Sequence, residues 1–255
     1  MRSIQRKILM TNLSLLFLLN SFSQNTDSNL KITQLTGDFY IFTTYNLYKG
    51  MRIPANGMYL VTSQGVAMFD SPWDSTQFQP LLDSIKLKHN KKVVLCIATH
   101  FHEDRTGGLE YYRLQGIQTF TTKRTDLLSK EKGMKRAEYL LDQDSLFKLG
   151  QYSFQTYYPG PGHAPDNIVI WFEKEKILYG GCLIKSTEAD DLGNLGDANQ
   201  IEYAGSVENV IRKCVDPKFV IPGHDDWTSI ASLKHTLKMA QQLKKKSSGK
   251  TSNRD

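Results

Sequence analysis

The stretch "ATHFHEDRTGGL" (residues 98–109) decides the fold prediction, because it joins an apolar run to a glycine turn. The preceding run "VVLCIA" (residues 93–98) is rich in β-branched residues and predicts a buried strand. The pair Gly107-Gly108 lets the backbone turn sharply into a helix, which we expect from about Thr106. Two histidines and two carboxylates fall within the five residues after Thr99. The stretch therefore predicts a strand, a polar loop and a helix in succession.

The rest of the chain repeats this alternation of strands and helices. Strand-like runs are expected at 30–37, 39–48, 57–63, 65–71, 91–99, 117–122, 151–158, 167–173, 176–181 and 218–222. Helices are expected at 78–85, from about 106, at 123–138, at 204–215 and over a last apolar stripe of Ile230, Leu233, Leu237 and Ala240. Two sheets, each covered by helices on its outer face, would bury these elements in a four-layer αββα sandwich of the α/β class. No linker interrupts residues 30–243, so one domain over residues 24–255 is expected.

The first 23 residues have the composition of a secretory signal peptide. A basic start, "MRSIQRK", precedes an apolar stretch too short to span a membrane, and "SFS" supplies small residues before Gln24. A membrane anchor or a buried first helix is the alternative, and the polar Thr11, Asn12 and Ser14 argue against it. We therefore expect export to the periplasm and no membrane anchoring after cleavage.

The positive charge of the chain is concentrated at its ends. Loss of Arg2, Arg6 and Lys7 with the signal lowers the formal net charge from +6 to +3, and the tail "KKKSSGKTSNRD" carries five cations against one anion. A nucleic-acid groove would need cations along a folded face, so a nucleic-acid partner is not expected. The tail from residue 244 is expected to be solvated and poorly ordered, and the protein to be a monomer.

The three cysteines do not form a disulfide framework, since an odd count cannot pair fully within one chain. Cys214 lies on a helical apolar stripe and Cys96 within a strand run, so both are expected in the core. Cys182, in "YGGCLIKS", is the remaining cysteine and is expected to be free or bound to a ligand. Among the histidines, His89 and His235 are expected to be solvated surface residues.

The remaining four histidines indicate a metal site. In an extended segment, side chains two apart point the same way, so His100 and His102 can reach one ion. A lone H-x-H in a loop is only weak evidence, but His163 in "PGPGHAPDN" and His224 in "VIPGHDDW" also follow glycine at strand ends. Glycine lets the backbone approach a crowded ion.

Counting donors favours two catalytic ions over one structural ion. His100, His102, His163 and His224 with Asp104 and Cys182 supply six ligands from four segments of the chain. A catalytic zinc takes three protein ligands and keeps one position open, whereas a structural zinc takes four. Imidazole, carboxylate and thiolate together favour zinc over magnesium or calcium. The expected cofactor is therefore a pair of Zn²⁺ ions.

Four motifs in this order, "THFHEDRTGG", "GPGHAPDN", "GGCLIKS" and "PGHDDW", resemble the metallo-β-lactamases of class B, subclass 1, of the flavobacterial type. The resemblance covers nearly all of the mature chain. Glyoxalase- and lactonase-type hydrolases of the same fold usually have a histidine after the motif aspartate and a bridging aspartate in the third motif. This chain has Arg105 and Cys182 there, which favours the lactamase.

The resemblance also implies roles for individual residues. It assigns one zinc to His100, His102 and His163, and the other to Asp104, Cys182 and His224. It further implies that Lys185 pairs with the substrate carboxylate and that Asn194 lies near the lactam carbonyl. A surface lysine and a turn asparagine are the alternatives for these two. Asp70 is expected either to orient a metal ligand or to cap the next helix.

The expected function is hydrolysis of the β-lactam amide bond of penicillins, cephalosporins and carbapenems, which gives antibiotic resistance. A zinc-bound hydroxide would attack the carbonyl, the second zinc would stabilise the leaving nitrogen, and Asp104 would orient the nucleophile. A serine nucleophile has no support, because G-x-S-x-G is absent from the sequence. The alternatives are a thioester or lactone hydrolase of the same fold and a non-enzymatic exported zinc-binding protein. A substrate panel and spectroscopy of the cobalt-substituted protein would discriminate them.

Overall fold

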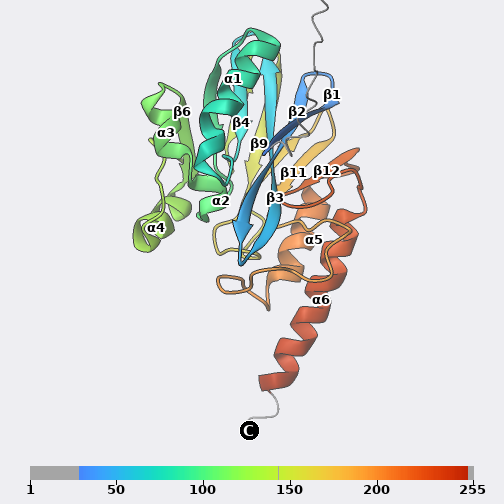
Figure 1. The fold of residues 1–255 in the computed structure, drawn as a ribbon. Helices are drawn as coiled ribbons and strands as arrows, with labels where there is room; N and C mark the ends of the chain where they lie inside the picture. Colours follow the sequence, from blue (N-terminus) through green and yellow to red (C-terminus); the bar gives the residue numbers. More distant parts are fainter. Residues whose placement is uncertain (1–28, 143, 252–255) are drawn as a thin grey trace, which may run out of the picture.

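The computed structural model describes residues 29–142 and 144–251, which form two β-sheets and flanking helices (Figure 1). The strands are β1 (Leu30–Thr36), β2 (Phe39–Tyr48), β3 (Met51–Thr62), β4 (Gly65–Phe69), β5 (Val93–Ile97), β6 (Gln118–Thr122), β7 (Tyr139–Leu141), β8 (Leu146–Leu149), β9 (Tyr152–Tyr157), β10 (Val169–Phe172), β11 (Ile177–Gly181) and β12 (Phe219–Pro222). The helices are η1 (Ser75–Gln77), α1 (Phe78–His89), α2 (Glu103–Thr106), α3 (Leu109–Leu114), α4 (Lys123–Lys132), α5 (Tyr203–Lys213) and α6 (Ser232–Thr251). The fold is thus mixed α/β, as predicted.

The larger sheet has seven strands in sequence order, from β1 to β7. Its first half is an antiparallel meander, in which β2 and β3 form a long hairpin that ends at the pair Tyr48 and Met51. Its second half, β4 to β7, is parallel, and α1, then α2 with α3, then α4 make the crossovers. Parallel strands place their carboxyl ends at the same edge of a sheet. The segments after β4 and β5 therefore lie next to each other.

The smaller sheet has the order β12-β11-β10-β9-β8. Only β11 and β12 run parallel, and α5 lies between them in the chain. Their carboxyl ends therefore also share one edge, and Cys182 and Gly223 follow them directly. In each sheet, two adjacent parallel strands lead directly into the candidate site. These strands are β4 and β5 in the larger sheet and β11 and β12 in the smaller one.

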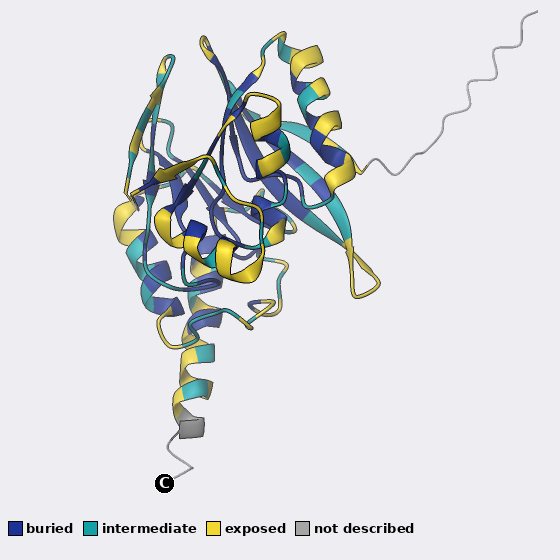
Figure 2. Ribbon diagram, turned by 90° about the vertical axis from the view of Figure 1, so that its left-hand side faces the viewer, coloured by how far each residue is buried: buried dark blue, intermediate teal, exposed yellow. Residues whose placement is uncertain are grey.

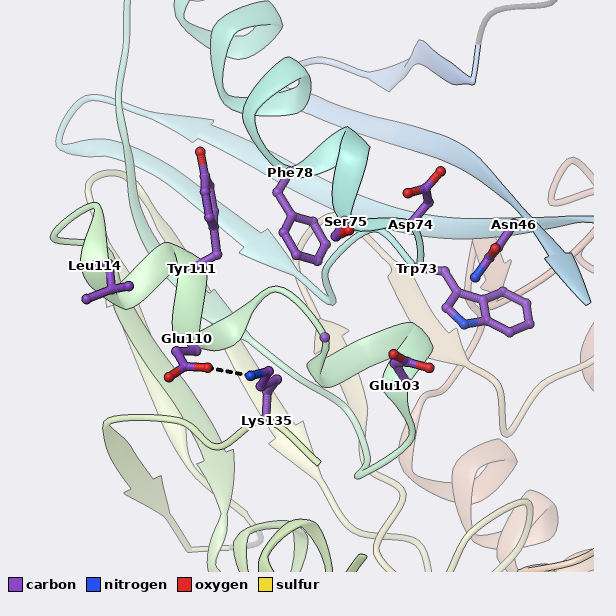
Figure 3. Close-up of a pocket in the computed structure, with 11 residues that line it drawn as sticks. Asn46, Trp73, Asp74, Ser75, Phe78, Glu103, Glu110, Tyr111, Leu114 and Lys135 are labelled. Carbon is purple, nitrogen blue, oxygen red and sulfur yellow. Dashed lines mark hydrogen bonds and ion pairs between the residues drawn. The ribbon is translucent and has the colours of Figure 1, made fainter. Parts of the chain in front are cut away.

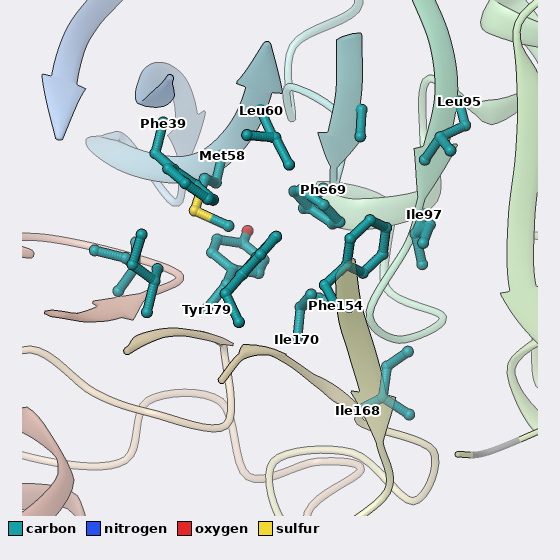
Figure 4. Packing of buried hydrophobic residues seen from close by; sticks show 14 of the residues in the cluster. Phe39, Met58, Leu60, Phe69, Leu95, Ile97, Phe154, Ile168, Ile170 and Tyr179 are labelled. Carbon is teal, nitrogen blue, oxygen red and sulfur yellow. The ribbon is translucent and has the colours of Figure 1, made fainter. Parts of the chain in front are cut away.

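Three clusters of buried residues define the layers. Phe69 and Phe154 lie in the central cluster between the two sheets, where their rings meet edge to face (Figure 4). Phe172 packs against both rings, edge to face on Phe69 and tilted on Phe154. A second cluster packs α5 and α6 on the smaller sheet, and a third packs α1 and α3 on the larger one. The buried faces of these elements turn inward and their exposed faces outward (Figure 2). This is the four-layer sandwich that the alternation of strands and helices predicted.

Several local expectations need correction. The helix expected from about Thr106 begins at Glu103, and the glycine pair separates α2 from α3. The last helix was expected to carry Ile230 on its apolar face. It begins only at Ser232, and Ile230 precedes it and is exposed. The strands β7 and β8, which are short and lie at the edges of the two sheets, were not predicted from the sequence.

The expectations for the two ends of the chain stay predictions. The last helix, α6, continues to Thr251, within the tail from residue 244 that was expected to be solvated and poorly ordered. The proposed signal peptide, residues 1–23, lies outside the described residues, as do residues 252–255. None of the helices in the described part of the chain combines the length and hydropathy that crossing a membrane requires.

Two histidines expected to be solvated make specific contacts instead. The Nε2 atom of His89 lies 3.0 Å from the hydroxyl of Tyr59, and its ring packs edge to face on Tyr40. His235 is half-buried, and its Nε2 atom lies 2.7 Å from the carbonyl oxygen of Ala189. Both side chains are therefore structural. All three cysteines are free and buried, in agreement with the prediction that no disulfide framework exists.

The β2–β3 pairing leads to a stability prediction at Gly57. The ring of Phe42 lies over this glycine, and a Cβ placed on Gly57 would meet Phe42 Cζ at 2.0 Å. We expect Gly57→Ala to lower the free energy of unfolding by about 1–3 kcal/mol, measured by urea denaturation. Gly205→Ala in α5 is the matched control, since its Cβ meets nothing within 4 Å and alanine favours a helix by up to about 1 kcal/mol. Equal stabilities of the two variants would contradict this packing.

Candidate metal centre

The candidate ligands lie where the carboxyl ends of β4 and β5 in the larger sheet meet those of β11 and β12 in the smaller sheet. His100 and His102 follow β5, and Asp104 lies in the first turn of α2. Cys182 follows β11 and His224 follows β12. The loop between β9 and β10 adds His163. The six side chains that the sequence predicted therefore come together at one edge of the sandwich.

Three imidazoles form the first cluster. His102 Nδ1 lies 3.1 Å from His100 Nε2 and 3.2 Å from His163 Nε2. Zn–N bonds of 2.0–2.1 Å around a tetrahedral ion place ligand atoms roughly 3.3 Å apart. Burial lowers the pKa of His100 and of His163 well below the usual value, so both rings are neutral and present lone pairs. The cluster thus fits a zinc ion.

The outer nitrogen of His102 is held by a carboxylate that the sequence analysis missed. Asp197 Oδ2 lies 3.1 Å from His102 Nε2, so this nitrogen carries the proton and Nδ1 presents its lone pair. Asp197 follows Asn194 by three residues in a loop without regular pattern, 95 residues from His102 along the chain. No spacing rule connects the two positions, so only the fold reveals the contact.

Asp104, Cys182 and His224 form the second cluster. His224 Nε2 lies 3.1 Å from Asp104 Oδ2 and 3.4 Å from Cys182 Sγ, and the thiol lies 3.4 Å from the same carboxylate oxygen. His224 Nδ1 donates to the Pro54 carbonyl oxygen at 2.7 Å, which leaves Nε2 to face the cluster. His100, Asp104 and Cys182 also lie within ligand distance of one another. The two clusters are therefore adjacent, and their nitrogen, oxygen and sulfur donors suit zinc.

In the metal-free second cluster, electrostatics favour an ionised Asp104 and a protonated His224. Burial alone would raise the pKa of Asp104, but the Arg105 guanidinium and His224 outweigh it and hold that pKa well below its usual range. Burial alone would lower the pKa of His224, but Cys182 and Asp104 raise it to about 9. A metal ion must therefore displace a proton from His224, as is usual for protein metal sites.

Arg105 is fully buried behind the second cluster. Its Nε atom donates to Cys182 Sγ at 3.2 Å, and one terminal nitrogen lies 2.9 Å from Asp104 Oδ2. The two terminal nitrogens donate to the carbonyl oxygens of Asn56 at 2.7 Å and Gly223 at 2.9 Å. One side chain on α2 thus connects β3 of the larger sheet with the ends of β11 and β12 in the smaller one.

Asp70 organises the adjacent loop. Its carboxylate accepts the Thr99 backbone N–H at 2.7 Å, the Thr99 hydroxyl at 3.0 Å and the Tyr179 hydroxyl at 2.7 Å. Burial raises the pKa of Asp70 to about 6, although Arg105 and these hydrogen bonds oppose the rise. Of the two expected roles, the contacts support positioning of the His100 segment. Asp74, not Asp70, caps the helical segment that follows, through the Thr76 N–H.

Lys185 and Asn194 lie on two segments that approach each other beside the clusters. A Cβ atom placed on Gly193, the residue before Asn194, would lie 3.8 Å from Lys185 Nζ. Lys185 as a whole residue is 9% exposed, and within residues 29–142 and 144–251 no hydrogen bond or ion pair involves its ammonium group. Burial lowers the pKa of this lysine. Asn194 is exposed, and its Oδ1 accepts the Gly196 N–H at 3.0 Å, as in a turn.

Comparison with known proteins places the chain in a family. The profile of the metallo-β-lactamase superfamily matches residues 52–224. A metallo-β-lactamase type 2 of Elizabethkingia meningoseptica is 44% identical over 228 residues, which cover 89% of this chain and 91% of that protein. Metallo-β-lactamase IND-1 of Chryseobacterium indologenes is 37% identical over 205 residues, which cover 80% and 86%.

Solved structures agree with these sequence relatives. The crystal structure of metallo-β-lactamase IND-7 superposes with a TM-score of 0.81 at 36% identity, over 84% of this chain and 98% of that one. A metallo-β-lactamase from Pontibacter korlensis gives 0.80 at 32% identity, over 83% and 99%. With Arg105 and Cys182 in the positions described above, the chain belongs to the metallo-β-lactamase superfamily, in its subclass B1.

The contacts of Arg105 lead to a stability prediction. Arg105→Met removes the guanidinium from buried partners and leaves Asp104 and Asp70 without their counter-charge. We expect the free energy of unfolding of the metal-free protein to fall by about 3–5 kcal/mol, measured in urea. Arg136→Met is the control, because Arg136 pairs with Asp126 at a half-exposed site where solvent screens the pair and a clearly smaller loss is expected. Similar losses in both variants would contradict the central role of Arg105.

Proposed function

We propose that this protein is an exported hydrolase that opens the β-lactam ring with the help of two zinc ions. The observation that carries the proposal is the pair of adjacent three-donor clusters, (His100, His102, His163) and (Asp104, Cys182, His224). Three donors per ion leave a coordination position open, which suits catalysis better than storage. The names of the relatives above support β-lactams as substrates. Penicillins, cephalosporins and carbapenems are the proposed substrate classes.

When bound, the zinc ions would supply a water activated at neutral pH and electrostatic stabilisation of the charge that develops on the substrate. The chain itself supplies orientation. Asp197 and Pro54 fix the tautomers of His102 and His224, and Arg105 together with Asp70 fixes the loops that carry the other ligands. A ligand set held in this way loses little free energy to reorganisation during the reaction.

Asp104 and Lys185 have distinct proposed roles toward the substrate. Asp104 remains ionised, so its carboxylate can accept a hydrogen bond from the attacking water and later hold a proton for the leaving nitrogen. The Lys185 ammonium suits the carboxylate that β-lactam antibiotics carry, because its side chain is largely buried and a substrate carboxylate would give it a charge-assisted hydrogen bond. Asn194, beside Gly193, is proposed to approach the lactam carbonyl after its side chain leaves the Gly196 N–H.

The β2–β3 hairpin is proposed to cover the bound substrate. Leu47, Tyr48 and Met51 at its tip are exposed apolar side chains, and its base is joined to the site by the His224–Pro54 hydrogen bond. A loop of this kind can exclude water from a substrate when it closes. Export to the periplasm rests on residues 1–23, whose composition is that of a signal peptide.

Hydrolysis assays test the proposed function directly. The zinc-loaded protein is expected to hydrolyse a carbapenem and a cephalosporin, seen as loss of the β-lactam absorbance, and a chelator is expected to abolish the activity. Restoring zinc should restore it. A zinc-loaded protein inactive on all β-lactam classes but active on a thioester or lactone would contradict the proposal.

Lys185→Met tests recognition of the substrate carboxylate. Loss of a charge-assisted hydrogen bond is expected to lower kcat/KM by about 10- to 100-fold, mainly through KM, with zinc content unchanged. Lys174→Met, at an exposed turn, removes the same charge elsewhere and should have no effect. An unchanged KM in Lys185→Met would show that this ammonium does not bind the substrate.

A further inference from the structure

Helix α6 carries positive charge and no negative charge. Its residues Ser232–Thr251 include six lysines and no aspartate or glutamate. Five of these lysines have a described side chain, and all five are exposed: Lys234, Lys238, Lys244, Lys245 and Lys246. In the part of the chain that the structure describes, their ammonium groups form no hydrogen bond and no ion pair. We call these five residues the basic face of α6.

Several cations elsewhere on the surface have partners. Lys135 pairs with Glu110 at 2.6 Å, beside the pocket between α1 and α3 (Figure 3). Arg136 pairs with Asp126 at 2.7 Å. In both pairs a carboxylate offsets the positive charge. The basic face of α6 lacks such carboxylates, so its charge is available to an outside partner.

The helix macrodipole does not account for the basic face. Cations are stabilised by the partial negative charge at the end of a helix, and this effect falls off within the last turn. None of the five lysines lies in the last turn of α6, which ends at Thr251. Lys234 lies in the first turn, where the dipole repels a cation. Stabilisation of the helix itself is therefore not the reason for this charge.

The outward side of α6 presents a straight row of cations. With 3.6 residues per turn, Lys234, Lys238 and Lys245 lie within about 40° of one another around the helix axis and span about 16 Å along it. Lys244 and Lys246 flank this row near the end of the helix, which projects past the rest of the described chain (Figures 1 and 2). A flat surface can therefore contact the row along its whole length.

The opposite side of α6 is fixed to the protein. Leu233, Met239 and Ala240 are buried in the cluster that includes residues of α5 and the smaller sheet. Ser247 Oγ donates to Gln200 Oε1 at 2.9 Å. These apolar side chains are thus not available for insertion into lipid, and packing fixes the direction in which the basic face points. A partner of this face is contacted through charge.

We propose that the basic face of α6 binds the anionic headgroups of a phospholipid bilayer. A bilayer is flat and negatively charged where it contains anionic lipids, and each lysine near such a surface adds to the attraction. The proposed export would bring the protein into a compartment bounded by membranes. The association is peripheral and reversible, unlike anchoring by a lipid or a membrane-spanning helix. It does not depend on the proposed hydrolysis, because none of the five lysines belongs to the candidate metal centre.

Vesicle binding tests the proposal. The zinc-loaded mature chain, residues 24–255, is sedimented at low ionic strength with vesicles of phosphatidylcholine that contain about 30% phosphatidylglycerol. We expect binding to these vesicles, no binding to phosphatidylcholine alone, and release by added salt, because salt screens the attraction between exposed charges. The triple variant Lys244→Gln/Lys245→Gln/Lys246→Gln is expected to have a partition coefficient about 30- to 100-fold lower.

A second triple variant controls for net charge. Lys31→Gln/Lys130→Gln/Lys174→Gln removes the same charge at three separate exposed positions and should lower the partition coefficient clearly less. Lysine and glutamine have similar helix propensities, so circular dichroism should be unchanged in the α6 variant. Equal losses in the two variants, equal binding to both kinds of vesicle, or binding that persists at high salt would overturn the proposal. A protein that binds vesicles but hydrolyses no β-lactam would refute the proposed hydrolysis alone.

Other anionic partners are compared at the same ionic strength. Duplex DNA and polyglutamate are labelled with a fluorophore, and their binding to the mature chain is measured by anisotropy. We expect both to bind more weakly, per negative charge, than the phosphatidylglycerol vesicles. Tighter binding of either polymer would assign the basic face to a nucleic acid or an acidic protein and would contradict the proposal.

Discussion

The guanidinium of Arg105 lies where the ends of strands from both sheets meet, and its N–H groups contact Cys182, Asn56 and Gly223. A buried arginine is tolerated only if nearly all of its donors find acceptors and its charge is compensated. Asp104 and Asp70 supply that compensation at 2.9 Å and 3.5 Å. This ion-pair network therefore joins the two sheets at this edge, together with the backbone hydrogen bond from Asn56 N–H to the Gly223 carbonyl oxygen, and it contacts the loops that carry the candidate ligands.

The same network helps to explain how one cysteine, one aspartate and four histidines can lie close together in a stable fold. Desolvation keeps His100 and His163 neutral, while Arg105 keeps Asp104 ionised. Neutral imidazoles and an ionised carboxylate are the protonation states that metal ligands need. The two adjacent clusters differ in chemistry, one with three nitrogens and one with oxygen, sulfur and nitrogen, and only in the second does a ligand, His224, have to lose a proton before it binds a metal.

The sequence predicted much of this arrangement, and the failures have physical causes. His100 and His102 could be paired because a strand-end segment is extended, and the glycine-flanked His163 and His224 follow strand patterns with strong local signals. Asp197 could not be found, since its contact depends on a loop whose path no local pattern encodes. The strands β7 and β8 were missed because short, half-exposed edge strands lack clear alternation.

A crystal structure of the zinc-loaded protein, with anomalous scattering recorded at the zinc edge, tests the central claim most directly. The account predicts two anomalous peaks, one bound by His100, His102 and His163 and the other by Asp104, Cys182 and His224, with Arg105 still in contact with Cys182. A single zinc that takes four ligands drawn from both clusters would contradict it. So would a second cluster that holds no metal at zinc concentrations that support full activity.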